Sequence, residues 1–159
     1  MIDLTIHIVL VEPEIPPNTG NVARSCAATG AKLHLVKPLG FSIDDKTMKR
    51  AGLDYWPYVD LEVHDCLKDF FHKYKDMPMY LVTTKGVRNY ADVTYEKNAM
   101  LLFGRETAGL PGALIEEYKN RTVRIPMSKD TKLRSLNLSN SVSIVLFEAL
   151  RQQNFPNLE

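Results

Sequence analysis

Cysteines, long apolar runs and excess charge are all scarce in this sequence. Cys26 and Cys66 are its only two cysteines, and they form no CxxC pair. This usage is typical of buried or free thiols in a reducing compartment and not of a disulfide framework. The apolar runs are too short to span a bilayer, and no basic segment followed by a long apolar run opens the chain. We therefore expect a cytoplasmic protein without a membrane segment.

The charges nearly cancel. The 159 residues include 20 Lys and Arg against 19 Asp and Glu, which gives a net charge of +1. A protein without a global basic field can contact nucleic acid only through a local basic patch, or through one built by association of subunits. The length suits a single domain spanning residues 1–159, and 45% of the residues are hydrophobic and can form its core.

Several common signatures are also missing. There is no GxGxxG after an apolar run, no GxxxxGK[ST] and no GxSxG, so an ordinary dinucleotide site, a P-loop and a nucleophile elbow are unsupported. The histidines show no metal-ligand spacing, and we expect no metal. We interpret His7, His34, His64 and His72 as structural or solvent-facing residues.

What the sequence does contain is an alternation of apolar runs and periodic segments. Strands are predicted at residues 4–11, 32–36, 79–83, 100–103 and 123–125, and helices at 21–29, 63–74, 111–119 and from about 141 to 150. Pro13, Pro16 and Pro17 predict a rigid loop after the first strand, because proline has no backbone donor. The alternation predicts an α/β layered fold with a parallel sheet.

Three polar loops each follow a predicted strand: Pro16 to Arg24, Gly104 to Pro111, and Met127 to Asn140. Ligands of open α/β sheets bind beyond the carboxyl ends of strands, so we place the site in these loops. The third loop is rich in Ser and Asn between Ser135 and Asn140. That density exceeds what one helix start requires, since only a few amides are unpaired there.

Each loop residue also has a plainer interpretation. Asn18 and Asn21 could cap a helix, and Arg24 could be a solvated helix residue. Glu106 could stabilise the start of the helix that follows it. Three basic residues of the third loop could be solvated or could contact phosphates; they are Lys129, Lys132 and Arg134.

The three loops resemble the motifs of the SPOUT RNA 2′-O-methyltransferases, in the same order. The matching segments are Asn18–Arg24 (NTGNVAR), Phe103–Pro111 (FGRETAGLP), and Ile125–Met127 with Arg134–Asn140 (RSLNLSN). One motif alone is weak, but the three together are specific. Without an additional RNA-binding domain, the chain is most similar to the small members of the family that modify the tRNA wobble position. Arg105 stands where related sequences often carry a small residue or Pro.

The resemblance implies a fold and a set of partners. It implies an α/β parallel-sheet fold with a C-terminal trefoil knot, a homodimer, and S-adenosyl-L-methionine as the cofactor. The implied substrate is the ribose 2′-hydroxyl of the wobble nucleotide, cytidine or modified uridine, in the anticodon stem-loop of leucine tRNAs. No membrane and no metal are implied.

The resemblance also implies roles for individual residues. Cofactor contacts fall on Val82, Thr83, Gly104, Ile125, Met127 and Ser135. Arg24, supplied by the partner subunit, is expected to lie nearest the reacting hydroxyl. Because a guanidinium is always protonated and accepts no hydrogen bond, we expect it to stabilise a developing alkoxide or a phosphate rather than act as a base. Asn18, Glu106 and Asn137, with Ser135, are expected to orient it and the loops.

Two other functions remain open. One is a non-catalytic RNA-binding dimer of the same fold, and the other is an α/β enzyme acting on a small molecule. The near-neutral charge slightly favours the small-molecule enzyme, whereas a basic helix face of Lys46, Lys49 and Arg50 and the Lys129–Arg134 loop count against it. For the dimer, we expect the apolar faces of the helix at Asn21 and of the last helix to form the interface.

Overall fold

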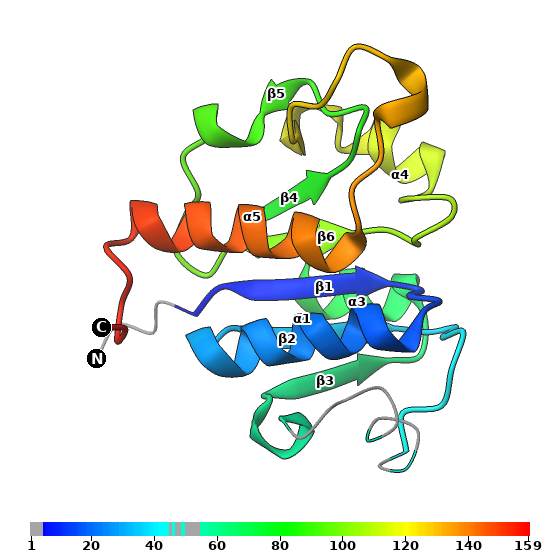
Figure 1. Ribbon diagram of the computed structural model, residues 1–159, viewed down its shortest axis with the longest axis vertical. Coiled ribbons are helices and arrows are strands. Elements are labelled where there is room, and N and C mark those ends of the chain that lie inside the picture. Colours follow the sequence, from blue (N-terminus) through cyan, green and yellow to red (C-terminus); the bar gives the residue numbers. More distant parts are fainter. Residues whose placement is uncertain (1–4, 45, 47–48, 50–54) are drawn as a thin grey trace.

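The computed structural model describes residues 5–44, 46, 49 and 55–159. Its centre is a seven-stranded, all-parallel sheet in the order β3-β2-β1-β6-β4-β7-β5 (Figure 1). The strands are β1 (His7–Val11), β2 (Lys32–Val36), β3 (Leu61–His64), β4 (Met79–Val82), β5 (Arg88–Asn89), β6 (Met100–Phe103) and β7 (Thr122–Arg124). The predicted α/β parallel-sheet fold is therefore confirmed. The predicted knot and homodimer stay predictions.

Helices cover both faces of this sheet. The α-helices are α1 (Pro16–Thr29), α3 (Leu67–Tyr74), α4 (Gly112–Glu117) and α5 (Leu138–Gln152), and short 3-10 helices are η1 (Trp56–Tyr58), η2 (Tyr90–Asp92), η3 (Lys119–Arg121) and η4 (Thr131–Leu133). Alternate strand residues point to opposite faces. Leu10 and Leu101 pack with α1 and α5 on one face, whereas Val9 and Leu102 pack with α3 and α4 on the other.

Helix α1 begins earlier than predicted. We expected a rigid loop through Pro17, but Pro16 and Pro17 form the first turn of α1. Proline is well suited there, because the first amides of a helix have no partner within the helix. Asn18 therefore lies inside the helix and makes no cap hydrogen bond, so its interpretation as a cap is wrong. The predicted end is confirmed: Gly30 has φ +78° and donates its N–H to the Cys26 carbonyl at 2.9 Å.

Two strands were missed. β3 takes up Val63, which we had assigned to a helix, and the helix itself begins at Leu67. Val63 and Leu67 are four residues apart, so the strand and the helix together imitate one helical stripe. β5 has two residues and lies at the sheet edge, where the apolar signal is weak. The predicted basic helix face of Lys46, Lys49 and Arg50 falls partly outside the described residues.

The apolar stripes of α1 and α5 are buried against the sheet and against each other. Val22, Ala23, Val145 and Leu146 are all fully buried within this one chain. The prediction that these stripes form a dimer interface is therefore wrong: they build the core. Cys26 lies in the same core, where burial raises the pKa of its thiol to about 12, and Cys66 is exposed. Both cysteines are free thiols, as predicted.

Three histidines form a ladder across β1, β2 and β3. His7 Nδ1 lies 2.9 Å from His34 Nε2, and His34 Nδ1 lies 3.0 Å from His64 Nε2. His34 and His64 are buried and His72 is exposed. Their interpretation as structural or solvent-facing stays a prediction, because ligand atoms of His34, Glu62 and His64 lie within 4.8 Å of one another. The carboxylate of Glu62 also lies near His64, at 3.4 Å.

The Glu62 carboxylate beside this ladder is already engaged. It accepts hydrogen bonds from Lys73 Nζ at 2.8 Å and Tyr74 Oη at 2.6 Å, and Lys32 Nζ lies 3.0 Å away. Two ammonium groups and a phenol leave little attraction for a further cation, so we interpret the cluster as structural.

In the part of the chain that the structure describes, no helix is long and apolar enough to cross a bilayer.

Candidate functional site

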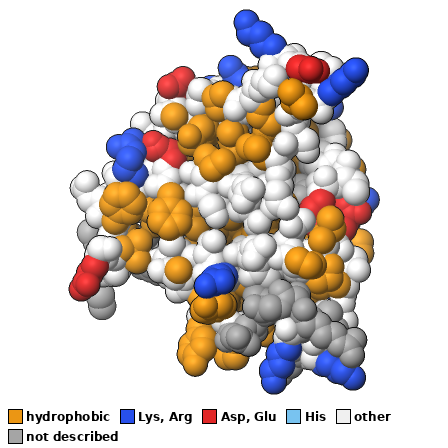
Figure 2. Space-filling model, in the orientation of Figure 1, with side chains coloured by type: hydrophobic (Ala, Val, Ile, Leu, Met, Phe, Trp, Pro, Cys, Tyr) orange, Lys and Arg blue, Asp and Glu red, His pale blue; other side chains and the backbone are white. Residues whose placement is uncertain are grey.

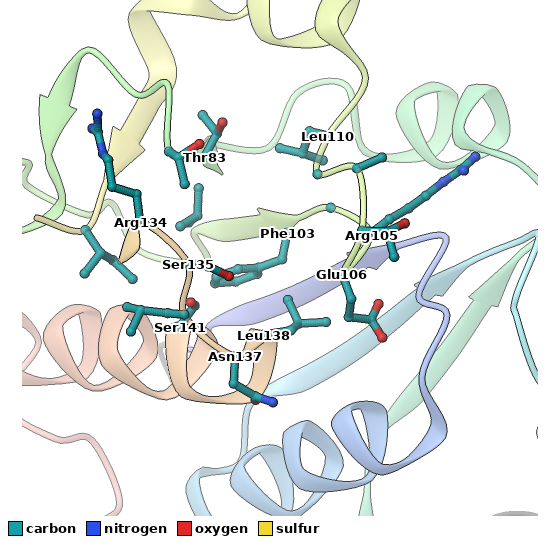
Figure 3. Close-up of a pocket in the computed structure, with 18 of the residues that line it drawn as sticks. Thr83, Phe103, Arg105, Glu106, Leu110, Arg134, Ser135, Asn137, Leu138 and Ser141 are labelled. Atoms are coloured by element: carbon teal, nitrogen blue, oxygen red, sulfur yellow. The ribbon is translucent and has the colours of Figure 1, made fainter. Parts of the chain in front are cut away.

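A pocket of about 530 Å³ opens beyond the carboxyl ends of β4, β6 and β7 (Figure 3). Its walls come from segments far apart in the sequence: the loops after these strands, the start of α1 and the start of α5. Figure 3 shows Phe103 at its floor, with Thr83, Ser135 and Leu138 around it. The site thus lies at the sheet edge where ligands of open α/β sheets bind.

A chain of hydrogen bonds ties three of these segments together. Glu106 accepts from the backbone N–H groups of Glu14 at 3.0 Å and Ile15 at 2.6 Å, and from Asn18 Nδ2 at 3.4 Å. Asn18 Oδ1 in turn accepts from Asn137 Nδ2 at 3.0 Å. Both carboxylate oxygens of Glu106 are therefore occupied, and the group holds the first turn of α1 against the loop after β6.

The third member of this chain also starts a helix. Asn137 Oδ1 accepts from the Ser139 backbone N–H at 2.9 Å and from the Ser139 hydroxyl at 2.6 Å. Asn137 is thus the N-cap of α5 and, through its amide nitrogen, the link to Asn18. The dense Ser/Asn segment does more than cap a helix, because it also joins two distant loops.

A second set of contacts joins the loop before α1 to the loop after β6. Glu14 accepts from the Thr107 hydroxyl at 2.7 Å and from its N–H at 3.1 Å, and these bonds lower the pKa of the Glu14 carboxyl. Arg105 donates to Glu12 at 3.1 and 3.2 Å. The unusual Arg105 is thus occupied within the chain and braces the pocket rim.

Two glycines allow the loop after β6 to turn back on itself. Arg105 and Gly109 exchange backbone hydrogen bonds at 2.9 and 3.2 Å, and Gly109 has φ +69°. A Cβ on Gly104 would lie only 2.0 Å from the Gly109 carbonyl carbon. The backbone that approaches Gly104 closely is therefore that of its own loop, and glycine allows this approach because it has no Cβ.

The pocket collects nine of the ten residues proposed for the site. They are Asn18, Val82, Thr83, Gly104, Glu106, Ile125, Met127, Ser135 and Asn137. Arg24 is the exception. It is exposed on α1, outside this pocket, and its guanidinium carbon lies 4.8 Å from the centroid of the Tyr55 ring.

The lining suits a small molecule with an apolar body and polar ends. Phe103, Leu110 and Leu138 supply apolar surface, whereas Thr83 and Ser135 supply hydroxyls. The volume lies within the roughly 300–1,000 Å³ of ordinary ligand sites. The one carboxylate of the lining, Glu106, is already bonded, so the pocket offers backbone groups, hydroxyls and the basic side chains of Lys85 and Arg134 for recognition.

Comparison with known proteins identifies the family. A model of the SpoU rRNA Methylase family matches residues 5–147. The chain belongs to the SpoU methylase family. A Yersinia pestis relative named tRNA (cytidine(34)-2′-O)-methyltransferase is 47% identical over 157 residues, which cover 95% of this chain and 96% of the relative. A Bacillus subtilis protein, whose assignment as a tRNA (cytidine(34)-2′-O)-methyltransferase is provisional, is 48% identical over 159 residues, with 98% of each chain covered.

Solved structures of SpoU-like proteins share the fold. A Bacillus anthracis protein, provisionally described as an RNA methyltransferase, matches with a TM-score of 0.91 and 50% identity over 97% of this chain and 98% of its own. A structure described as giving insights into the 2-OH methylation of C/U34 on tRNA has a TM-score of 0.88 and 40% identity, covering 96% and 99%. AviRb from Streptomyces viridochromogenes, in complex with AdoMet, has a TM-score of 0.79 and 25% identity, covering 97% and 62%.

Some lining residues of this SpoU pocket were not predicted. Thr84 and Lys85 follow β4, and Leu138 and Ser141 lie one turn apart on α5. The first pair could have been found, because the loop after a strand is the rule that located the other loops. The second pair required knowing that the first turn of α5 faces the pocket.

Proposed function

We propose that this chain transfers a methyl group from S-adenosyl-L-methionine to the ribose 2′-hydroxyl of nucleotide 34 in tRNA. The observation that carries the proposal is the pocket itself, whose walls are the three polar loops held together by Glu106, Asn18 and Asn137. The near-full-length relatives, named for methylation of cytidine 34, support the substrate. Cytidine or modified uridine in leucine tRNAs is the finer substrate that we propose.

S-adenosyl-L-methionine is the methyl donor, and the pocket lining fits it. When bound, it supplies an electrophilic methyl group on a positively charged sulfur. We infer that the contacts fall on residues at or just after the ends of β4, β6 and β7 and in the segment before α5. They are Val82, Thr83, Gly104, Ile125, Met127 and Ser135. Phe103, Leu110 and Leu138 supply apolar surface against which the donor can pack.

The residues of the hydrogen-bonded chain act as positioning groups in this proposal. Both Glu106 oxygens accept backbone N–H groups, and Asn18 and Asn137 are bonded to each other. None of them is free to take the proton of a ribose hydroxyl. They hold the loops at the geometry that the reaction needs. Alignment of the reactants can account for a large part of the reduction in the activation barrier.

Arg24 is assigned to the reacting hydroxyl of the partner subunit's site. It lies outside the pocket of its own chain and is exposed, which supports delivery across a homodimer interface. Its guanidinium can stabilise the alkoxide that develops as the hydroxyl attacks, or bind the neighbouring phosphate. The proton leaves to another acceptor, because a guanidinium has no lone pair for it.

The exposed side of α1 and α5 is the surface that we propose for this homodimer. Ile144 is half-buried and Phe147 is 45% exposed on α5, and Arg24 and Ala28 are exposed on α1. On the face that carries these two helices, hydrophobic groups lie separated by polar surface (Figure 2). We also propose the trefoil knot of the SPOUT fold, supported by the passage of the chain from β7, near one sheet edge, to α5, which packs on α1.

Methyl transfer from labelled donor to bulk tRNA tests the activity. Label is expected on RNA at one wobble nucleotide, where the 2′-O-methyl group makes the following phosphodiester bond resistant to alkali. Label on a base or on protein would overturn the 2′-O assignment. Binding of tRNA without any methyl transfer would instead support the non-catalytic RNA-binding dimer.

Arg24→Ala tests the catalytic assignment separately. Turnover is expected to fall at least 100-fold, the usual scale for one stabilising donor, while the affinity for the methyl donor measured by calorimetry stays unchanged. The pocket of the same chain does not include Arg24, so a large loss of donor affinity would place this residue in the wrong role.

A further inference from the structure

Arg24 differs from Arg105 and Arg151 in what its guanidinium contacts. Arg105 pairs with Glu12 and Arg151 pairs with Glu148, at 3.1 and 2.7 Å. In the described part of the chain, no carboxylate lies within 4.0 Å of the Arg24 guanidinium. Its guanidinium lies instead over the Tyr55 ring, with 4.8 Å between the guanidinium carbon and the ring centroid.

A ring face and a carboxylate hold a guanidinium in different ways. A carboxylate takes two N–H donors and cancels the charge. An aromatic face attracts the cation through its quadrupole and fixes the plane of the group, but it consumes no N–H donor. Arg24 over Tyr55 therefore keeps its charge and its donors available for an oxyanion or a phosphate, while losing part of its rotational freedom.

Tyr55 is itself supported by the fold. It directly precedes η1, and its carbonyl accepts the Tyr58 backbone N–H at 2.9 Å. Within this turn Trp56 and Val59 pack against the hydrophobic cluster that also contains Val22 of α1. The turn contacts α1 directly. The ring is thus fixed relative to the helix that carries Arg24.

We propose that Tyr55 is a positioning residue, which holds the Arg24 guanidinium in the orientation that it presents to the partner subunit's pocket before RNA binds. The inference rests on the proposed role of Arg24. A group oriented in advance stabilises developing charge without reorganising during the reaction. Tyr55 acts through Arg24 and needs no contact with donor or RNA.

Substitution of Tyr55 in the full-length protein tests this role. Tyr55→Leu removes the ring and is expected to lower kcat by about 5- to 30-fold, the rate equivalent of one cation–π contact. The affinity for the methyl donor is expected to stay the same. Tyr55→Phe keeps the ring and is expected to retain the wild-type rate. Tyr58→Leu, in the same turn and 78% exposed, is the matched control and is expected to leave kcat unchanged.

A second measurement separates positioning from a structural role. In an Arg24→Lys background, Tyr55→Leu is expected to cost much less than in the wild type, because the two residues act as one unit. Equal losses in both backgrounds would overturn the inference, as would a Tyr55→Phe rate as low as that of Tyr55→Leu. If Arg24→Ala is inactive and Tyr55→Leu is fully active, the inference about Tyr55 fails alone. An active Arg24→Ala variant would remove the proposed role of Arg24 itself.

Discussion

Glu106 follows a strand and precedes a helix, which gave two interpretations of the residue. The structure resolves them in favour of a bridging role, because its two oxygens accept the N–H groups of Glu14 and Ile15. These two amides precede α1 and lie about 90 residues away in sequence. No local pattern around residue 106 could have predicted such partners.

Glu106→Gln is expected to weaken the pocket. An amide offers one acceptor oxygen, so one of the two backbone N–H groups would face another donor. An unpaired N–H group of this kind costs about 1–3 kcal/mol of unfolding free energy. The affinity for S-adenosyl-L-methionine should fall as well. Urea unfolding and calorimetry measure the two effects. Glu117→Gln, on the exposed side of α4, is the control, and equal stability of both variants would contradict the bridging role.

The histidine ladder predicts a pH dependence of stability. Burial, followed by the charges of His7 and His64, lowers the pKa of His34 from 6.5 to about 3. As the pH falls below 6.5, the His34 imidazole binds a proton in the unfolded chain but stays neutral in the folded chain. The contribution of His34 to stability is complete above that pH and is lost progressively between about 6.5 and 3.

His34→Gln is expected to flatten this dependence. Between pH 6 and 5 the unfolding free energy of the wild type should fall more steeply than that of the variant, by about 1.4 kcal/mol per pH unit. The window avoids Glu62: burial opposes its ionisation, but hydrogen bonds from Lys73, Tyr74 and Lys32 outweigh this and lower its pKa to about 2. His72→Gln, at an exposed position, should keep the wild-type slope. A slope unchanged in His34→Gln would contradict the assignment.

Among the elements, the buried strands were the easiest to predict. Residues 100–103 form a continuous apolar run that ends at Gly104, and residues 32–36 carry apolar side chains at 33, 35 and 36 between Gly30 and Pro38. The two segments form β6 and β2 with those bounds. The start of α1 was hidden because Pro16 and Pro17 are equally compatible with a loop and with a first helical turn. Their role depends on Glu106, which holds the amides of Glu14 and Ile15 from outside the helix.

The candidate site was also predicted only in part, because its loops could be grouped from the sequence but the contacts between them could not. Loops that follow parallel strands meet at one sheet edge, so their residues could be grouped from sequence. Hydrogen bonds between the loops could not, since Asn18 and Asn137 are 119 residues apart. The exposed position of Arg24 over Tyr55 likewise depends on a turn far from α1 in sequence.

Alanine substitutions at two glycines, Gly104 in the loop after β6 and Gly112 at the start of α4, are expected to have very different effects on donor binding. In Gly104→Ala the new Cβ would meet the Gly109 carbonyl carbon at 2.0 Å, so the loop must open. We expect a loss of about 1–3 kcal/mol in stability and at least a tenfold loss of donor affinity, which is about 1.4 kcal/mol. Gly112→Ala, at the start of α4 with nothing within 4 Å of the Cβ, should bind donor normally. Normal donor binding by Gly104→Ala would show that the loop shape is not needed.

At the scale of the whole molecule, the central question is whether a site is shared between two chains. Co-expression of Arg24→Ala with Gly104→Ala tests this. Random pairing makes half of the dimers mixed, and each mixed dimer has one site with an intact pocket and an intact arginine. At a methyl-donor concentration that leaves the Gly104→Ala pocket mostly empty, activity of about one quarter of the wild type is expected, well above that of either variant alone. No recovery in the mixture would argue for a site contained within one chain.

The bond between Asn18 and Asn137 also has a consequence for protein synthesis. The wall that completes the pocket is translated last, shortly before α5. A nascent chain that extends through β6 contains β1 and α1 but still lacks the third wall. The methyl donor therefore cannot guide the early stages of folding, and its affinity for the polypeptide should arise only after the third wall has been translated.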